Sequence, residues 1–524
     1  MFILIFYSRI VTFLNHSFLL TPGGKMTVDV LGEFRKRKKS LDSNNLVLRQ
    51  SCKGKLTAME RIQMLLDKNS FIELYGFVES HDKELERKKR PRDGVITGIG
   101  TINKRHVCVY AQDFTFMGGS MGEMHNKKIG KLIEQAIKNK CPFIGLLDSG
   151  GARIQEGISA LDSGGEIFRL NAKASGIIPQ ISAILGPCAG IAVYSPCLTD
   201  FVFTLDKKSH TLVTGYVKTK KVSGNVTSYK GMCSANTRDD KRCIAHFVAR
   251  DEKQCMQMIK ILLSYLPQNN LECPPVISTN DDPERLNNNL ATTVRPNRTY
   301  DARSVVMEVL DKKSFLEIQE CCAKSVVTGL GRLNDNVVGV VGTQPATQSA
   351  WMDVNASDKI SKFVRFCDRF NTPLVNFVDS PGFPTNQEDG GVMRHVAKIF
   401  YAYSKASTPK ISLIMRRAFD GSYIAFASKE MGYDYVIAWP QAEIAVMSAE
   451  QAVSVINKKE FTGRHKEQIR KKRIREYKEK FYNPYIGAQQ GRVDLIIHPK
   501  DTRKTLIKCL EMVKNKKIKA FSTL

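Results

Sequence analysis

The sequence predicts an α/β fold in which one structural unit occurs twice along 524 residues. The first observation is repetition: four blocks return in the same order, 230 to 244 positions later. The pairs are residues 67–73 with 311–317, 95–100 with 326–331, 143–150 with 374–382, and 178–182 with 408–412. So long a period excludes a solenoid and indicates a duplicated domain of about 230 residues. The second observation is that strand-like apolar runs alternate with helical segments, which is typical of layered α/β proteins.

The first unit begins with a helix near residue 58, because Thr57 and Glu60 have the spacing of a capping box. A strand over 107–110 then leads into a glycine turn, and a helix is expected over 125–136. In the second unit we expect a strongly basic helix over 464–480. A strand over 492–499 should precede the last helix.

These patterns divide the chain into a leader with an N-terminal helix (1–50), a first domain (51–275), a linker (276–300) and a second domain (301–524). The apolar segment 1–20 contains Arg9, Asn15 and His16 and lacks the basic start and cleavage site of a signal peptide. It is also too short and interrupted to span a membrane. We expect a mis-assigned start or a disordered leader, with an organelle transit peptide as the alternative.

Basic residues exceed acidic ones by 27, which favours a polyanionic partner: nucleic acid, a membrane surface or a phosphate-rich ligand such as coenzyme A. We interpret most of this charge as a lysine-rich solvated surface, including the block 35–39, and no platform of aromatic and basic residues favours nucleic acid. The 13 cysteines form no CxxC pair, so neither a zinc site nor a disulfide framework is expected. They are typical of reduced, mostly buried thiols in a cytosol-like compartment.

The segment 186–196 carries the main functional hypothesis. An apolar run enters a small-residue turn at Gly190, after which a helix begins. The first N–H groups of a helix have no partner within it, and such fixed donors can hold negative charge on an oxygen during a reaction. By itself the pattern favours an ordinary βα turn. The duplication supplies a counterpart at 419–423, however, and two matched turns suggest one reaction with two oxyanions.

Several longer motifs carry a resemblance to a known family. They are KGKLTAMERI (53–62), DGVITGIGTI (93–102), AQDFTFMGGS (111–120), DSGGARIQEG (148–157), GPCAGIAVYSPCLTDF (186–201), FVRFCDRFNTPLVNFVDSPGF (363–383) and AWPQAEIAVM (438–447). The chain thereby resembles the carboxyltransferase (β) subunits of biotin-dependent acyl-CoA carboxylases, and among them the propionyl-CoA carboxylase type. The resemblance implies two tandem crotonase-like domains, each a β-β-α superhelix. It also implies a hexameric ring with each active site between one subunit's first domain and another's second.

In this family the carboxyl group passes from carboxybiotin to the α-carbon of an acyl-CoA, here most simply propionyl-CoA to methylmalonyl-CoA. The resemblance implies that the N–H groups of Gly190 and Ile191 face the thioester oxygen. Those of Gly421 and Ser422 would face the biotin oxygen. The acyl-CoA pocket would include Gly150, Gly151, Ala152, Asp420 and Ile424.

The resemblance also implies partners. This chain contains neither an Ala-Met-Lys-Met biotinylation site nor a P-loop. A separate biotin carboxylase and biotin carrier (α) subunit would therefore carry biotin and use ATP and bicarbonate. We expect no metal, no nucleic acid and no membrane, and a place in the bacterial cytosol, with the mitochondrial matrix as the alternative.

Some residues depart from the family pattern. Ile191 replaces a glycine, which keeps the N–H but narrows the pocket and disfavours left-handed backbone angles. The Asp420 carboxylate would repel an oxyanion unless it points to solvent or pairs. Ile424 replaces an aspartate, so the preferred acyl group stays open. The segment 215–242 and a shortened loop after Gly382 also differ, so we expect an active enzyme with shifted preference. A purely structural β subunit and a same-fold decarboxylase remain alternatives.

Four side chains near these motifs could titrate or react. Asp148 and Asp379 stand at strand ends and are expected to cap the following helices. His395 is expected to pack or to lie in an interface rather than act as a base. Cys188 is expected to be a small packed thiol, because no base stands beside it in the sequence.

Overall fold

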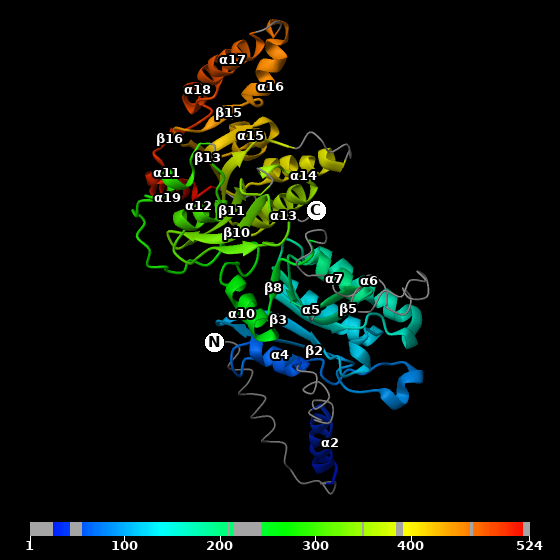
Figure 1. Cartoon of the computed structure of the whole chain (residues 1–524). Coiled ribbons are helices and arrows are strands. Elements are labelled where there is room, and N and C mark those ends of the chain that lie inside the picture. The colour runs from blue at the N-terminus through cyan, green and yellow to red at the C-terminus, as the bar shows by residue number, and fades with distance from the viewer. Residues whose placement is uncertain are drawn as a thin grey trace.

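The protein is described by a computed structural model that covers residues 25–41, 55–206, 209–212, 243–296, 298–347, 350–383, 391–461 and 465–516. Two α/β domains follow one another along the chain, and each is an eight-stranded sheet flanked by helices (Figure 1). The predicted duplicated α/β fold is therefore confirmed. Most of the leader, the segment 215–242 and the loop after Gly382 lie outside the described residues.

The first sheet has the order β1-β2-β3-β4-β5-β6-β8, and β7 pairs with β5. Its strands are β1 (Ile72–Leu74), β2 (Val95–Ile102), β3 (Arg105–Gln112), β4 (Phe143–Ser149), β5 (Gln180–Ala189), β6 (Phe201–Leu205), β7 (His210–Leu212) and β8 (Phe247–Ala249). β1, β2 and β3 are antiparallel, and the strands from β3 onward are parallel. Strand β4 is buried along its whole length, which explains why it reads as an apolar run without alternation.

The helical segments up to the end of this domain are α2 (Lys25–Leu41), α4 (Ala58–Leu65), η2 (Lys83–Lys88), α5 (Glu123–Asn139), η3 (Met117–Gly119), η4 (Ile154–Glu156), α6 (Gly157–Ala174), α7 (Ile191–Leu198) and α10 (Glu252–Leu263). The capping box of α4 is confirmed: Glu60 N–H donates to Thr57 Oγ1 at 3.2 Å, and Thr57 N–H donates to Glu60 Oε2 at 2.7 Å. Residues 30–39 of α2 are exposed, so the basic block lies on a solvated helix as expected.

The second sheet repeats the first, with the order β16-β14-β13-β12-β11-β10-β9 and with β15 paired to β13. Its strands are β9 (Leu316–Ile318), β10 (Val326–Leu333), β11 (Asn336–Thr343), β12 (Leu374–Ser380), β13 (Lys410–Phe419), β14 (Tyr435–Ala438), β15 (Glu443–Ala445) and β16 (Leu495–Ile496). The expected strand over 492–499 is confined to Leu495 and Ile496, and Pro499 begins a 3₁₀ turn.

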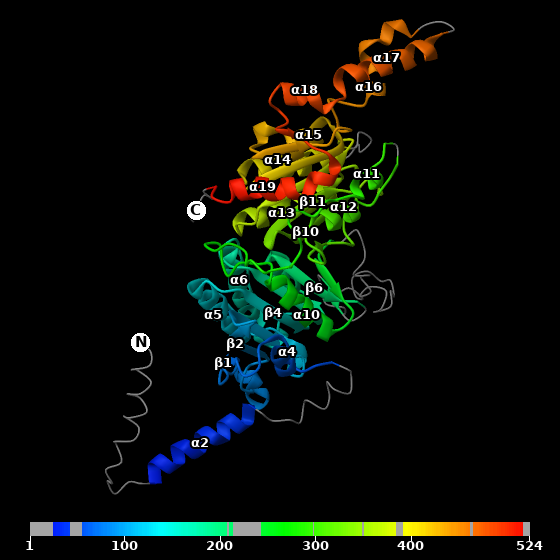
Figure 2. The ribbon, with the colours of Figure 1, turned by 90° about the vertical axis from the view of Figure 1, so that its left-hand side faces the viewer.

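The helical segments of the second half are α11 (Leu290–Thr293), α12 (Ala302–Val309), α13 (Val354–Arg369), α14 (Gly391–Lys405), α15 (Asp420–Ala427), η6 (Lys429–Met431), α16 (Ala449–Ile456), η7 (Lys458–Glu460), α17 (Lys466–Phe481), α18 (Pro484–Gln489), η8 (Pro499–Asp501) and α19 (Thr502–Val513). The basic helix is α17, which buries none of its residues and projects with α16 from the end of the molecule (Figure 2). None of the helices in the described ranges is long and apolar enough to cross a membrane.

The two domains share a packed seam. The Tyr265 hydroxyl of the first domain donates to the Ser314 carbonyl at 2.6 Å. The Phe201 and Phe366 rings, one from each domain, meet edge to face with centroids 4.7 Å apart. One cluster of buried apolar side chains contains residues of both sheets, so the domains share part of their core.

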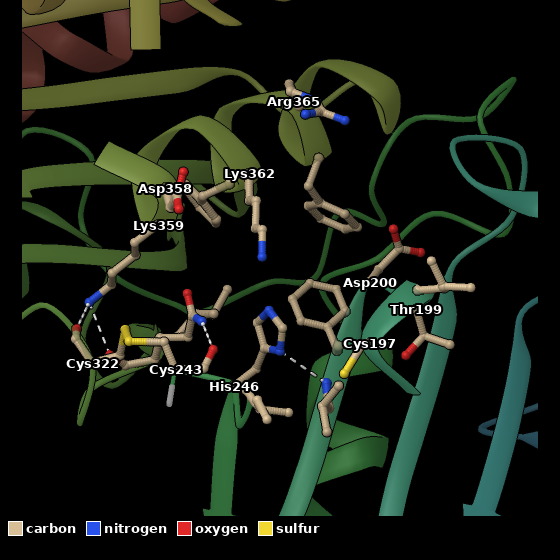
Figure 3. A pocket seen from close by; sticks show the side chains of 18 of the residues that line it. Cys197, Thr199, Asp200, Cys243, His246, Cys322, Asp358, Lys359, Lys362 and Arg365 are labelled. Atoms are coloured by element: carbon tan, nitrogen blue, oxygen red, sulfur yellow. Dashed lines mark hydrogen bonds between the residues drawn. A yellow bond between two sulfur atoms is a disulfide. The ribbon is translucent and has the colours of Figure 1, made fainter. Parts of the chain in front are cut away.

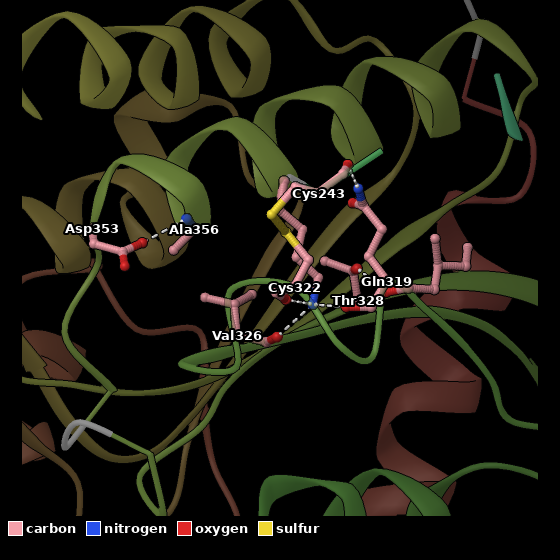
Figure 4. The surroundings of a disulfide bond; sticks show 9 residues. Cys243, Gln319, Cys322, Val326, Thr328, Asp353 and Ala356 are labelled. Atoms are coloured by element: carbon pink, nitrogen blue, oxygen red, sulfur yellow. Dashed lines mark hydrogen bonds between the residues drawn. A yellow bond between two sulfur atoms is a disulfide. The ribbon is translucent and has the colours of Figure 1, made fainter. Parts of the chain in front are cut away.

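A disulfide crosses this seam and corrects the expectation of fully reduced cysteines. Cys243, just before β8, is bonded to Cys322, between β9 and β10, and 79 positions separate them (Figure 4). The Gln319 side-chain amide donates to the Cys243 carbonyl at 3.0 Å and adds a second link beside it. The spacing of cysteines along a sequence does not show such a pair, because the fold alone brings the two segments together.

Candidate active site

The Gly190 turn connects the end of β5 to the start of α7. Gly190 has φ of 55° and ψ of −126°, in the region that favours glycine, and Ile191 is the first residue of the helix. The left-handed backbone thus falls on Gly190, and the expected conflict with a branched Ile191 does not arise. A Cβ added at Gly190 would meet no atom within 4 Å, so the space beside this turn is open. The first N–H groups of α7 have no partner in the helix and can serve a ligand.

The structure brings the predicted glycine turn at 150–152 against Gly190. Gly151 has φ of 101°, and a Cβ there would come within 2.7 Å of the Ala189 carbonyl oxygen. Only glycine permits this approach. The turn is held on its other side, because the Met121 N–H donates to the Gly151 carbonyl at 2.8 Å. Four residues therefore lie together beyond the carboxyl ends of strands β4 and β5: Gly150, Gly151, Ala152 and Gly190.

Asp148 lies beneath these turns and is not a helix cap, contrary to the prediction. Its carboxylate is fully buried and accepts from Lys55 Nζ at 3.1 Å and from Arg61 Nη2 at 3.0 Å. Arg61 also pairs with Glu252 at 2.7 Å. A Cβ on Gly186 would come within 2.2 Å of Asp148 Oδ1, so a glycine in β5 makes room for this pair. The network fixes β4 and β5 to α4 and α10 next to the turn.

The second turn connects β13 to α15. Strand register makes Asp420 the counterpart of Gly190, because Ser149 pairs with Cys188 in the first sheet and Ser380 with Ala418 in the second. Gly421 is likewise the counterpart of Ile191. Asp420 has φ of 51°, so an aspartate stands where the backbone favours glycine.

Around this turn, the side chains differ from those of the first. Asp420 is exposed, which satisfies the condition that its charge faces solvent. A Cβ on Gly421, the counterpart of Ile191, would come within 2.7 Å of the Phe383 ring, so an aromatic side chain covers this position. Ser422 is buried, and its hydroxyl donates to the Phe419 carbonyl at 2.6 Å. Ile424 is 47 % exposed. Phe383 was missed in the sequence, because nothing in its neighbourhood shows that its ring folds back over Gly421.

Asp379 occupies the place of Asp148 in the second domain and is also not a cap. Its fully buried carboxylate accepts from the Tyr300 hydroxyl at 2.9 Å, from Arg416 at 2.9 Å and from Arg417 at 3.0 Å. The two aspartates are therefore buried ion-pair centres with different cationic partners. Two consecutive arginines at the end of a strand were the available signal for this contact.

Of the two other side chains, Cys188 is the packed thiol that was expected. It is fully buried, and burial raises its pKa well above the usual value. His395 Nδ1 lies 2.8 Å from Asp358 on α13, so the ring packs between helices rather than at either turn. Across the described residues, no group of three or more His, Cys, Asp or Glu side chains is placed to hold a metal ion.

The two turns lie in different domains, and α7 and α15 are well separated in space within one chain (Figure 1). Each is bordered by exposed apolar side chains. Near the first turn, Ile154 and Ile158 are 88 % and 78 % exposed, and in the second domain Met393 and Tyr401 on α14 are 79 % and 63 % exposed. One chain therefore does not join the two turns, and apolar surface remains uncovered beside both.

Two features define the class of this protein. They are the duplicated α/β fold and, in each half, a βα turn whose first helix N–H groups have no partner in the helix. The carboxyl transferase domain family matches residues 49–524, and the chain belongs to it. It is thus an enzyme of the carboxyltransferase class, with two tandem crotonase-like domains.

Among similar proteins, the carboxyltransferase subunit of propionyl-CoA carboxylase from Haloferax mediterranei is 45 % identical over 497 residues, 94 % of this chain and 96 % of the relative. The methylmalonyl-CoA decarboxylase subunit alpha of Veillonella parvula is 43 % identical over 94 % of this chain and 96 % of the relative. The crystal structure of transcarboxylase 12S, a hexamer with methylmalonyl-coenzyme A bound, superposes with a TM-score of 0.89 at 41 % identity, covering 96 % of this chain and 98 % of that one.

Proposed function

We propose that this chain transfers a carboxyl group from carboxylated biotin to the α-carbon of a short-chain acyl-CoA, with propionyl-CoA as substrate and methylmalonyl-CoA as product. The observation that carries the proposal is the pair of βα turns, one per domain, with unpaired helix N–H groups at each. The propionyl-CoA carboxylase relative and the transcarboxylase with bound methylmalonyl-coenzyme A support the substrate class.

On the acyl-CoA side, the N–H groups of Gly190 and Ile191 are the proposed donors to the thioester oxygen. Removal of the α-proton moves negative charge onto that oxygen, and donors fixed in advance stabilise this charge without reorganisation. Each such donor is worth about 3–4 kcal/mol in other oxyanion holes. Gly150, Gly151 and Ala152 form the adjacent wall, and the absence of side chains on the two glycines lets the thioester approach the backbone.

On the biotin side, the N–H groups of Gly421 and Ser422 are the proposed donors. Biotin, when bound, supplies the carboxyl group, and a urea oxygen that gains negative charge needs hydrogen-bond donors. The turn fits this need, because the Ser422 hydroxyl is already used on the Phe419 carbonyl and only backbone N–H groups are left to donate. The Asp420 side chain is exposed in the single chain, so it is not packed against the two proposed donors.

We also propose the assembly that such a site requires. The separation of the two turns within one chain and the exposed apolar residues beside both support active sites between one copy's first domain and another copy's second, in a hexamer. An α subunit would carry biotin and load it by using ATP and bicarbonate. The bacterial and archaeal origin of the relatives supports a cytosolic location for this enzyme.

A second candidate is the reverse direction, decarboxylation of methylmalonyl-CoA, which the Veillonella parvula relative favours. The same two sets of donors serve both directions, because the transition state is shared. Ile424, exposed on α15, is the proposed determinant of acyl preference.

The test is carboxylation by the purified complex with an α subunit, ATP and bicarbonate, on acetyl-, propionyl- and butyryl-CoA. We expect transfer to propionyl-CoA, and Gly421→Pro should abolish it, because the proline ring removes one N–H donor and also collides with Phe383, 2.7 Å from the Cβ position. A complex that assembles but transfers no carboxyl group to any of the three would overturn the proposal in favour of a structural subunit. Turnover of methylmalonyl-CoA with free biotin, without carboxylation, would select the reverse direction.

A further inference from the structure

A cavity of about 430 Å³ lies at the seam between the domains. The connection from α7 to β6 forms one wall, helix α13 forms the facing wall, and the floor contains His246 and the disulfide (Figure 3). A volume of this size suits a small organic ligand.

This cavity lies at the opposite end of α7 from the Gly190 turn. Ile191 begins α7, whereas Cys197 and Leu198 at its end line the cavity. An eight-residue helix is about 12 Å long. Neither of the proposed donors, Gly190 and Ile191, is among the lining residues.

Both sulfur-bearing residues of the disulfide line the cavity. Cys243 is half-buried, whereas Cys322 is only 5 % exposed. Cys243 is therefore the more accessible residue of the pair. The disulfide thus belongs to the edge of the shared core and at the same time lines a cavity at the domain boundary.

The cavity carries positive charge from one face of α13. Lys362 and Arg365 are exposed, and neither has an ion-pair partner among the residues that the structure describes. Lys362 points into the cavity (Figure 3). The Lys359 ammonium lies beside the disulfide and donates to the Cys322 carbonyl at 2.9 Å.

Two carboxylates also line the cavity, but neither offsets this charge in full. Asp358 is already paired with His395 and with Lys398, each at 2.8 Å. Asp200 accepts the Gln180 N–H at 2.8 Å, and burial raises its pKa to about 7. The cavity is thus positive near neutral pH, and it attracts anions.

We propose that this cavity is a thiol–disulfide exchange site for a small anionic thiol, which opens the Cys243–Cys322 bond and so releases the covalent link between the domains. Glutathione and coenzyme A share the required chemistry, since each carries a thiol and negative charge.

The exchange proceeds in two balanced steps. The thiolate of the ligand attacks the sulfur of Cys243, a mixed disulfide forms, and the Cys322 thiolate leaves. The positive charge of Lys359 favours this thiolate, while the three N–H groups of the ammonium stay on backbone carbonyls. A second thiol then attacks the mixed disulfide. The two protein cysteines are reduced, and the two ligand thiols are oxidised to a disulfide.

The test measures how fast the Cys243–Cys322 bond opens in the full chain, in its native assembly, by alkylation and mass spectrometry. Glutathione, coenzyme A and neutral 2-mercaptoethanol are compared at equal thiolate concentration. Lys362→Gln should slow opening by the anionic thiols roughly three- to tenfold and leave opening by 2-mercaptoethanol unchanged. Lys253→Gln, an exposed lysine on α10 outside the cavity lining, removes the same charge and should change neither rate.

Three results would overturn the proposal. Lys362→Gln could slow the neutral thiol as much as the anionic ones. The bond could open only when the protein unfolds. Both cysteines could also alkylate in native protein never exposed to a reductant. To identify the thiol, Cys322→Ser is incubated with the glutathione and coenzyme A disulfides, and the mass of the adduct on Cys243 shows which one enters.

Discussion

Lys128 and Lys359 stand 231 positions apart and make the same contact in the two domains. Each buried ammonium donates to the carbonyl of the first residue of an antiparallel hairpin, Lys128 to Val95 at 2.5 Å and Lys359 to Val326 at 2.8 Å. Burial lowers the pKa of Lys128 to about 7 and that of Lys359 to about 8. Backbone carbonyls that β-pairing leaves free are thus satisfied by one lysine in each copy of the fold.

Lys359→Met should therefore destabilise the protein. The lysine also donates to the carbonyls of Gln319 and Cys322, at 3.0 and 2.9 Å, so the change leaves three acceptors without this donor. We expect a loss of about 2–4 kcal/mol in the free energy of unfolding. Urea denaturation measures it. The control is Lys362→Met, an exposed lysine on the same helix, which should change stability by less than about 0.5 kcal/mol. Equal effects of the two changes would contradict the assigned role.

Ile191→Pro tests the first set of donors with little disturbance of the fold. Ile191 is the first residue of α7, where proline is well accepted, so the change chiefly removes one N–H. We expect kcat to fall by roughly 10²- to 10³-fold, equivalent to about 3–4 kcal/mol. Ile191→Ala keeps the N–H and should retain most of the activity. Steady-state kinetics of both variants measure kcat, and far-UV circular dichroism checks that both are folded. Equal losses of kcat in the two variants would contradict the role of the Ile191 N–H as a donor.

Asp420 allows a test of backbone strain at the second turn. Its φ of 51° suits glycine and is tolerated by aspartate, but it costs about 1–2 kcal/mol for alanine. Asp420→Ala should therefore unfold at lower temperature than Asp420→Gly, although both remove the carboxylate. A difference of about 1 kcal/mol between the two is expected in thermal unfolding. If the variants prove equally stable, the turn does not hold this conformation in solution.

His246 should make the seam sensitive to acid. Its Nδ1 accepts the Val202 N–H at 3.1 Å, and burial together with the charges of Lys362 and Lys359 lowers its pKa to about 3. The unfolded chain takes up this proton near pH 6.5, well before the folded protein does. The stabilisation is thus complete above pH 6.5 and is lost as the pH falls toward 3. His246→Gln should flatten this part of the plot of unfolding free energy against pH, and an unchanged slope would exclude the histidine as its source.

The repeats in the sequence were sufficient to predict two α/β units, because the blocks at 95–100 and 326–331 became equivalent strands, β2 and β10. The roles of Asp148 and Asp379 could not be predicted in the same way. A carboxylate at a strand end is well placed to cap a helix, but the cations that pair with it, such as Arg61, come from distant segments of the chain. Tertiary contacts of this kind outweigh the local pattern.

The disulfide and the position of the Phe383 ring could likewise not be predicted from the sequence, because both depend on tertiary contacts. Cys243 and Cys322 lie in different domains, and their pairing depends on how the two sheets pack. Phe383 covers Gly421 because the chain after β12 folds back over α15. By contrast, the positive φ of Gly190 could be predicted from the sequence, because a turn between a strand and a helix commonly has glycine at a position of positive φ.

The two turns carry different side chains at equivalent positions, because Gly190 corresponds to Asp420 and Ile191 to Gly421. The duplicated halves are therefore no longer interchangeable. A substitution that is tolerated in one turn meets different neighbours in the other, since a side chain at Gly421 must displace the Phe383 ring.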